Sequence, residues 1–342
     1  MLPPVLVRRL VLAPGMVVLA AVLVTGLPVL LLLAIALSTV LPGRWRALRL
    51  LWMVLLHLVL ESVALVALFV LWVASGFGWR LRTPAFQRAH YVLVRWYLQV
   101  IYWECERVLH VRVVVEGPAP RSYAGRPLLI LSRHAGPGDS FLVVHALVNW
   151  YAREPRIVLK DTLQWDPAID VVLNRLPNRF IRPERSAAGS DGSRDQVLAR
   201  IGELSHNLDD NDAFVIFPEG GNFTEHRRKR AIERLRRQGH IDEAEKAERL
   251  RHVMAPRPGG VLAALTRAQD ADIVFVAHTG AEHMSTVLDV WRELPMDREI
   301  QMRWWIVAAA DVPEGEEARI DWLYEWWARI DDWITARQAE RA

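Results

Sequence analysis

Two long apolar segments near the N-terminus set the strongest limit on how this chain can fold. Residues 10–43 contain no charged side chain, and residues 50–79 are interrupted only by His57 and Glu61. A helix of about 20 residues crosses the hydrocarbon core of a bilayer, so each segment is long enough to do so. A cleaved secretion signal would be shorter and would end in small residues, so that alternative is rejected. We expect a transmembrane or membrane-embedded helical hairpin over residues 1–83.

Helix-breaking and ionisable residues add detail to this hairpin. Pro14, Gly26 and Pro28 lie in the first segment, so a kinked or partly interfacial helix is expected there. His57 and Glu61 are four positions apart and therefore share one face of the second helix. Ionisable groups inside a membrane are functional candidates by default. The favoured interpretation here is a polar pair satisfied between two packed helices.

The distribution of arginine indicates an orientation for the hairpin. Its two ends carry more arginine than the connector between its helices. By the positive-inside rule, we expect a cell (inner) membrane protein whose remaining chain faces the cytoplasm. A hairpin that enters one leaflet and returns is the alternative. Residues 84–110 are expected to form an amphipathic interfacial helix or linker, with an ordinary buried helix as the alternative.

The overall composition excludes several classes of protein. The chain has 342 residues, enough for one or two domains, and its formal net charge is only +3. Its one cysteine, Cys105, supports neither a disulfide framework nor a cysteine zinc site. Nearly all basic residues are arginine, but no nucleic-acid-binding motif accompanies them, so no nucleic acid partner is expected.

After residue 110, short apolar runs alternate with helical patterns. This alternation predicts an α/β fold with a mixed sheet flanked by helices, and we assign residues 111–342 to one domain. The expected strands are Val111–Glu116, Pro127–Ser132, Arg156–Leu159, Ala213–Phe217, Asp272–Ala277 and Ile300–Ala308. The expected helices are Ser140–Tyr151, Asp191–Asn207, Glu225–His252, Pro258–Arg267 and Ile320–Arg337.

A turn rich in glycine and proline, residues 132–140, carries a histidine and an aspartate. Positions i and i+5 of a single helix point about 140° apart, so one helix does not direct His134 and Asp139 to one point. Both side chains can meet at one point if His134 ends a strand and Asp139 begins a helix after a tight turn. A carboxylate beside an imidazole raises its basicity and fixes its tautomer, which produces a general base. The competing interpretation is that Asp139 merely caps the following helix.

A second turn contains Glu219, Gly220 and Gly221, directly after the apolar run at residues 213–217. Paired glycines let backbone N–H groups approach an anion closely. A carboxylate at Glu219 would repel phosphate, so it is expected to bind a hydroxyl or to fix the turn. A plain strand-end turn is the alternative.

Basic residues elsewhere supply further candidates for substrate binding. Arg182 and Arg185 lie in a third turn, where their guanidinium groups could make bidentate contacts to phosphate. Lys160 is an additional candidate.

Together these residues resemble the glycerolipid acyltransferase family, to which lysophosphatidic acid acyltransferases belong. The resemblance covers residues 129–280 in the family's order. The matching motifs are the H-x4-D pair His134 and Asp139, the second block at Phe180-Ile181-Arg182, the third block at Pro218-Glu219-Gly220, and segments 223–224 and 253–260 of one membrane-bound branch.

The resemblance implies a glycerol-3-phosphate acyltransferase-like fold and a mechanism. His134 would be the base on the free hydroxyl of a lysophospholipid, first of all 1-acylglycerol-3-phosphate, with Asp139 holding its ring. The acyl donor would be acyl-CoA or acyl carrier protein, a co-substrate, so the resemblance implies neither a cofactor nor a metal ion. Glu219 and Gly220 would hold the acceptor, and Arg182 or Arg185 its phosphate. Membrane lipids would be the surroundings and the source of the acceptor.

The chain departs from the family pattern where the acceptor phosphate is expected. Gly221 and Asn222 stand where the family often has Thr and Arg, so lysophosphatidic acid, another lysophospholipid and a glycolipid all remain open as acceptors. Two other functions compete with acyl transfer. One is a thioesterase or lipid hydrolase in which His134 activates water, although a G-x-S-x-G element is absent from the sequence. The other is a membrane scaffold whose turns are only helix caps.

Overall fold

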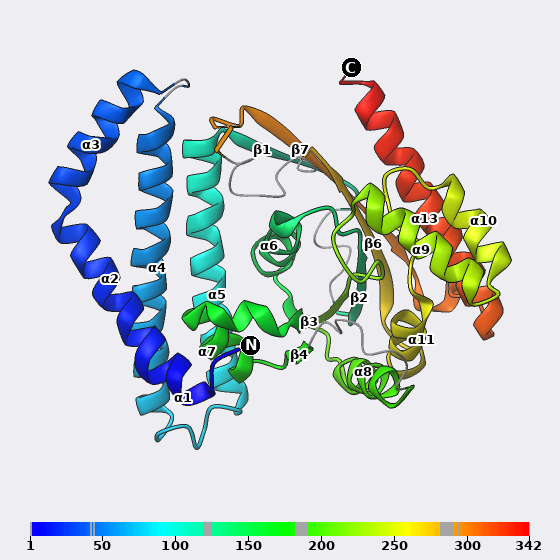
Figure 1. Ribbon diagram of the computed structural model, residues 1–342. Coiled ribbons are helices and arrows are strands. Elements are labelled where there is room, and N and C mark those ends of the chain that lie inside the picture. The colour runs from blue at the N-terminus through cyan, green and yellow to red at the C-terminus, as the bar shows by residue number, and fades with distance from the viewer. Residues whose placement is uncertain are drawn as a thin grey trace. The chain divides into compact units, whose positions relative to one another are not determined.

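The computed structural model describes residues 2–41, 43, 45–118, 125–181, 191–280, 291–292 and 294–341, in two compact units (Figure 1). The first unit comprises Met1–Arg112, Val158–Ala187 and Thr286–Arg298. The second comprises Val113–Ile157, Ala188–Ser285 and Glu299–Ala342. The first unit thus combines the N-terminal 112 residues with two segments from the later part of the chain.

Helices make up most of the first unit. They are α1 (Val5–Val7), η1 (Arg8–Leu12), α2 (Ala13–Thr25), α3 (Leu27–Val40), α4 (Arg46–Ala74), α5 (Pro84–Glu104), η2 (Cys105–Leu109), η5 (Asp161–Trp165) and α7 (Pro167–Arg175). The expected kink is present, because α2 ends at Thr25 and α3 begins at Leu27 with Pro28 in its first turn. Figure 1 shows α2 and α3 meeting at a bend, and both helices contact α4.

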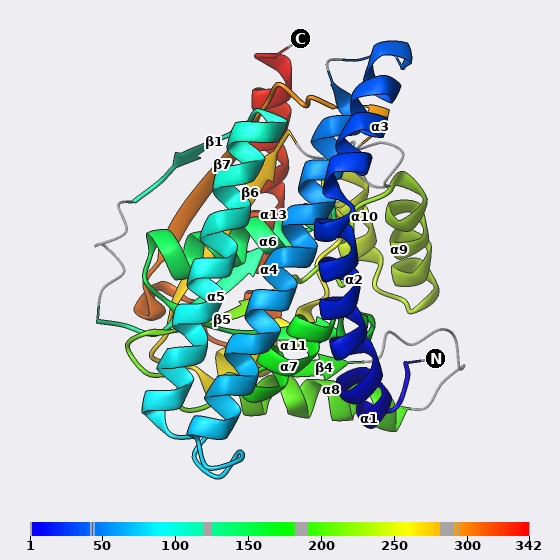
Figure 2. The same ribbon diagram turned by 90° about the vertical axis from the view of Figure 1, so that its left-hand side faces the viewer.

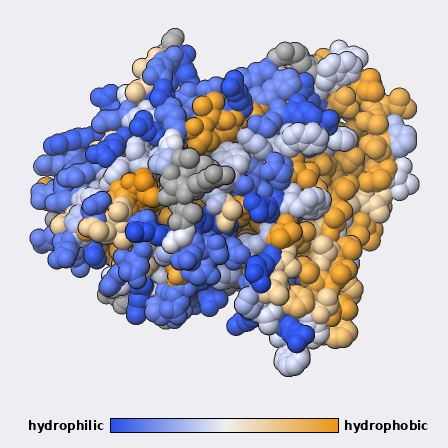
Figure 3. All heavy atoms as spheres, turned by 180° about the vertical axis from the view of Figure 1, so that it is seen from behind, coloured by the Kyte–Doolittle hydropathy of each residue, from blue (hydrophilic) through white to orange (hydrophobic). Residues whose placement is uncertain are grey.

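An apolar surface covers these N-terminal helices. Val5–Thr25 and Arg46–Ala74 are long and apolar enough to cross a membrane. Exposed apolar side chains include Leu10, Val18, Val22, Leu32 and Phe69. Figure 3 shows apolar side chains gathered in a broad band over this part of the molecule. Large exposed apolar patches mark protein-binding or membrane-binding surfaces. The length and composition of the two helices suggest association with a membrane.

The interior of the first unit lies among α4, α5 and α7. Leu68 and Tyr91 pack with Val171 of α7, and α4 and α5 lie side by side (Figure 2). Asp166 caps α7, because its Oδ1 accepts a hydrogen bond of 2.9 Å from the N–H group of Ile169. The sequence did not predict α7, since it has only nine residues and its proline at the first position resembles a turn.

A seven-stranded sheet has the order β1-β7-β6-β2-β5-β3-β4. Its strands are β1 (Val111–Glu116), β2 (Leu128–Ser132), β3 (Glu154–Lys160), β4 (Arg179–Ile181), β5 (Asp212–Ile216), β6 (Asp272–Thr279) and β7 (Arg298–Val307). In the second unit β2 runs parallel to both β5 and β6, whereas β7 is antiparallel to β6. β2, β5 and β6 are buried along their whole length, as is typical of parallel strands covered on both faces. The predicted mixed α/β fold is confirmed.

Helices cover both faces of this sheet in the second unit. They are α6 (Pro137–His145), η4 (Ala146–Trp150), α8 (Asp191–Leu204), α9 (Glu225–Arg237), α10 (Ile241–Arg249), α11 (Pro258–Arg267), η6 (Ala309–Asp311) and α13 (Glu316–Ala339). Figure 1 shows α6 on one face and α13 on the other. Phe275 of β6 stacks on Trp326 of α13 with ring centroids 4.3 Å apart, and Trp326, Trp327 and Trp333 of α13 are buried in the core.

Two details of the predicted elements are wrong. The single helix expected over residues 225–252 is the pair α9 and α10, because Gly239 between them has a positive φ of 82° that a helix does not accommodate. The short strand β4 (Arg179–Ile181) was not expected, since three residues carry too little pattern to indicate a strand.

Candidate active site

The candidate catalytic residues lie where three neighbouring parallel strands end. β6, β2 and β5 are adjacent in the sheet, with Ser132 opposite Val276 and Leu131 opposite Ile216. His134 therefore follows β2 at the same edge at which Glu219 follows β5. Ligand sites of α/β proteins form at the carboxyl ends of parallel strands. The sheet topology thus brings the first and third sequence motifs together.

Asp139 holds the turn between β2 and α6 from its place in the first turn of that helix. Its Oδ2 accepts hydrogen bonds from the backbone N–H groups of Ala135 and Gly136. The same oxygen lies 3.6 Å from Nδ1 of His134, and the carboxylate is buried. This distance exceeds that of a hydrogen bond, although catalytic contacts often tighten when substrate binds. Asp139 therefore both orders the turn and faces the imidazole, so the two sequence interpretations coexist.

A second histidine, not predicted from the sequence, contacts the same carboxylate. His278 near the end of β6 is buried, and its Nε2 lies 3.6 Å from Oδ2 of Asp139. The same nitrogen is 3.1 Å from the backbone oxygen of Arg133. Burial alone would raise the pKa of Asp139, but the two histidines, a backbone N–H group and Arg133 together lower it. The carboxylate of Asp139 is therefore negatively charged at neutral pH.

Glu219 is buried beneath the turn rather than exposed to a ligand. Its Oε1 accepts a 3.2 Å hydrogen bond from the N–H group of His134, and its Oε2 accepts another of 3.2 Å from Met254. Burial raises the pKa of the Glu219 carboxyl to about 8, against the opposing effect of Arg133 and the two N–H groups. Glu219, which follows β5, thus links two other backbone segments by hydrogen bonds: the turn after β2 and the segment before α11.

Two arginines flank the glycine turn that follows Glu219. Gly220 has a φ of 69°, and a Cβ there would come within 2.9 Å of the guanidinium of Arg257. A Cβ on Gly221 would come within 3.0 Å of Nη1 of Arg227, which donates a 3.2 Å hydrogen bond to the backbone oxygen of Asn222. Glycine at both positions lets two guanidinium groups lie directly over the turn. Cationic side chains of this geometry suit a phosphate.

Three candidates from the sequence remain: Arg182, Arg185 and Lys160. Arg182 and Arg185 lie outside the described residues. Lys160 is exposed at the end of β3, in the first unit, whereas the cluster around His134 belongs to the second. The sequence offered one signal for the missed His278, a polar residue directly after the predicted apolar strand 272–277. Arg257 lies in segment 253–260, which resembles one branch of the family, but the sequence indicates no role for this arginine.

The comparison with known families agrees with this geometry. No curated protein matches the chain. A family model described as Acyltransferase matches residues 111–286, just over half of the chain. The match contains both the turn at His134 and the turn at Glu219, and it supports a transferase that moves acyl groups. The chain therefore belongs to the acyltransferase family.

Proposed function

We propose that the protein is a membrane-bound O-acyltransferase that moves a fatty acyl group from acyl-CoA or acyl carrier protein to the free hydroxyl of a lysophospholipid, with 1-acylglycerol-3-phosphate as the favoured acceptor. The observation that carries this proposal is the pairing of His134 with the ionised Asp139 at the carboxyl edge of the parallel strands. The two apolar N-terminal helices support a location at the membrane that supplies the acceptor. A cytoplasmic face of the inner membrane fits the distribution of arginine.

His134 carries the proton in the proposed reaction. Its Nδ1 lies on the side of Asp139, which leaves Nε2 for the hydroxyl of the acceptor. As Nε2 takes the hydroxyl proton, the acceptor oxygen attacks the thioester carbonyl and forms the ester C–O bond. The C–S bond then breaks, and the proton passes from His134 to the leaving sulfur. The charge of Asp139 stabilises the imidazolium that exists between these two transfers.

The glycine turn is the proposed binding site for the acceptor headgroup. Arg257 and Arg227 lie over Gly220 and Gly221, and together they offer two positive charges to one phosphate. These arginines compensate for Asn222, which stands where the family often has arginine. Glu219 supports this site by fixing the turn through its backbone hydrogen bonds. Arg182, Arg185 and Lys160 remain proposed contacts to the phosphates of either substrate.

An acyl-transfer assay tests the proposal. It uses the purified full-length protein in detergent, labelled acyl-CoA and a panel of lysophospholipids. We expect transfer of label to a phospholipid, with release of thiol that depends on the added acceptor. His134→Ala should abolish both, and His206→Gln serves as the matched control because His206 is an exposed histidine. Normal turnover by His134→Ala would contradict the mechanism. Thiol release that does not depend on acceptor would identify a thioesterase instead.

A further inference from the structure

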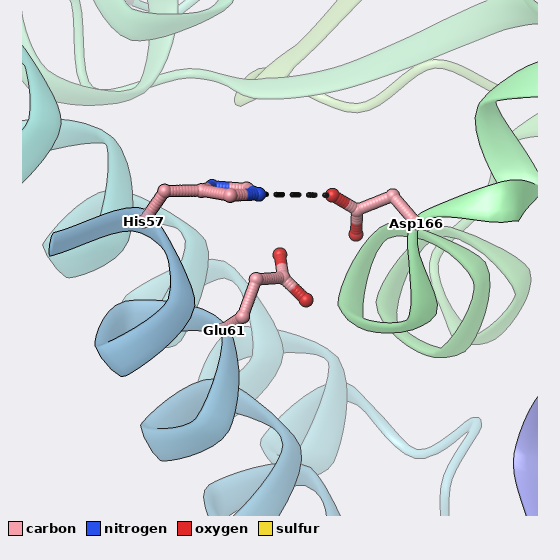
Figure 4. A group of neighbouring side chains, drawn as sticks. All are labelled: His57, Glu61 and Asp166. Carbon is pink, nitrogen blue, oxygen red and sulfur yellow. Dashed lines mark ion pairs between the residues drawn. The ribbon is translucent and has the colours of Figure 1, made fainter. Parts of the chain in front are cut away.

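A polar cluster lies in the first unit, apart from the residues assigned to acyl transfer. His57 and Glu61 project from α4 toward Asp166 at the start of α7, and the side chains point toward a common centre (Figure 4). Nε2 of His57 and Oδ2 of Asp166 are 3.9 Å apart. One nitrogen and two carboxylate oxygens of these residues all lie within 4.8 Å of one another. Glu61 is fully buried, whereas His57 and Asp166 are partly exposed.

The hydrogen bonds around the cluster leave acceptors facing one another. The hydroxyl of Tyr97 donates to Oε1 of Glu61 over 3.2 Å and lies 3.3 Å from Nδ1 of His57. Because that hydroxyl has only one hydrogen, Nδ1 must be the donor in the contact with His57. Nε2 of a neutral His57 then carries a lone pair and faces two carboxylates. A proton or a metal ion must therefore lie among these three groups.

The surrounding residues supply no such cation. Within the described residues, no lysine or arginine is paired with Glu61 or Asp166. The other oxygen of each carboxylate is already held by a backbone N–H group: Oε2 of Glu61 by Ala168 over 3.2 Å, and Oδ1 of Asp166 by Ile169 over 2.9 Å. Both carboxylates are therefore oriented, with capacity left to bind an ion. Metal ligands are typically held by outer partners of this kind.

We propose that His57, Glu61 and Asp166 bind a divalent transition-metal ion such as Zn²⁺ or Mn²⁺. An ion about 2.0–2.2 Å from each donor atom needs donors roughly 3–4 Å apart, so side-chain shifts of about 1 Å complete the site. One imidazole with two carboxylates suits these ions better than Mg²⁺, which prefers oxygen ligands and bound water. Tyr97 is the outer partner that fixes the tautomer of His57. The exposed side of His57 leaves a position for water.

The bound ion would join α4 to α7 inside the first unit. These two helices come from segments about 100 residues apart in the sequence, and the ion adds a fixed link between them. A metal that binds only the folded chain raises the free energy of unfolding. The increase grows with the logarithm of the ratio of the metal concentration to the dissociation constant. The proposed site is thus structural, and it is independent of the acyl-transfer proposal.

Metal binding by the full-length protein in detergent tests this site. After removal of metal with a chelator and addition of Zn²⁺, metal analysis and calorimetry should detect one ion per chain that Asp166→Asn and Glu61→Gln lose. Asparagine still caps a helix, so Asp166→Asn is expected to fold while it binds Zn²⁺ at least tenfold more weakly. Tyr97→Phe should weaken binding about tenfold or more, because it removes the outer partner of two ligands.

A surface pair provides the matched control. His240 lies 3.3 Å from Glu243 on an exposed part of the second unit, so it represents adventitious binding by a histidine and a carboxylate. His240→Gln should retain the bound ion and the rise in unfolding temperature that Zn²⁺ causes. Equal Zn²⁺ binding by the wild type and Asp166→Asn, or no binding by either, would overturn the proposal. The second outcome would assign the missing cation to a proton on the cluster.

Discussion

At the scale of single residues, the negative charge of Asp139 is the feature with the clearest consequence. Asp139→Asn keeps an oxygen for the N–H groups of Ala135 and Gly136 and removes the charge that faces His134. We expect the fold to persist and kcat to fall about 100-fold or more, because the imidazolium loses its counter-charge. Steady-state kinetics beside a thermal unfolding curve measure the two effects separately. A kcat within twofold of the wild type would show that Asp139 serves only the turn.

The raised pKa of Glu219 predicts how the stability of the fold depends on pH. Its pKa is about 8 in the folded chain against an ordinary value of 4.5, so between these values the folded chain keeps a proton that the unfolded chain has released. Stability therefore falls as pH rises through this window. Glu219→Gln does not titrate, but it loses one backbone hydrogen bond, at a cost of about 1–3 kcal/mol. The difference in unfolding temperature between the wild type and Glu219→Gln should shrink from pH 5 to pH 8. A constant difference would mean that Glu219 is ionised throughout.

At the scale of elements, the turn between β5 and α9 is the proposed binding site for the acceptor headgroup, and Arg257 lies over it. Arg257→Gln should raise the KM for 1-acylglycerol-3-phosphate about tenfold, as expected for the loss of a charge-assisted hydrogen bond. The KM for an uncharged monoacylglycerol should be unaffected. Arg249→Gln is the control, since Arg249 is an exposed arginine at the end of α10. An increase confined to the KM for acyl-CoA would assign Arg257 to the phosphates of the donor.

The elements also show which parts of the fold a local sequence pattern can predict. The buried strands β2, β5 and β6 were predictable, because a short apolar run before a glycine turn is a strong local signal. α7 and β4 are short, and their stability comes from packing against distant parts of the chain, which no local pattern contains. The candidate site likewise contains residues that a local pattern predicts and one that it does not. His134 and Asp139 are neighbours in the sequence, whereas His278 meets them only because β6 pairs with β2.

At the scale of the whole molecule, the division into two units does not follow the order of the sequence. The sequence predicted a boundary at residue 111, yet the first unit includes Val158–Ala187 from beyond it. α7 lies in that segment and packs its apolar face on α4 and α5. Local composition identifies the apolar N-terminal segments, but it does not reveal which later helix they cover. The N-terminal helices thus support part of the fold in addition to forming a candidate membrane anchor.

A truncated chain that begins at Val111 tests this dependence. It would expose Val171 and Val172 of α7 and Leu176 directly after it, each buried in the full chain. Burial of one such side chain contributes about 1.5–3 kcal/mol, and a whole domain is stable by only about 5–15 kcal/mol. We therefore expect the truncated chain to aggregate or to unfold at a lower temperature. A chain that begins at Arg46 keeps α4 and α5, so it should remain monodisperse in detergent. Size-exclusion chromatography and thermal unfolding compare the two, and a stable monomer from residue 111 would show that the expected boundary is a true domain boundary.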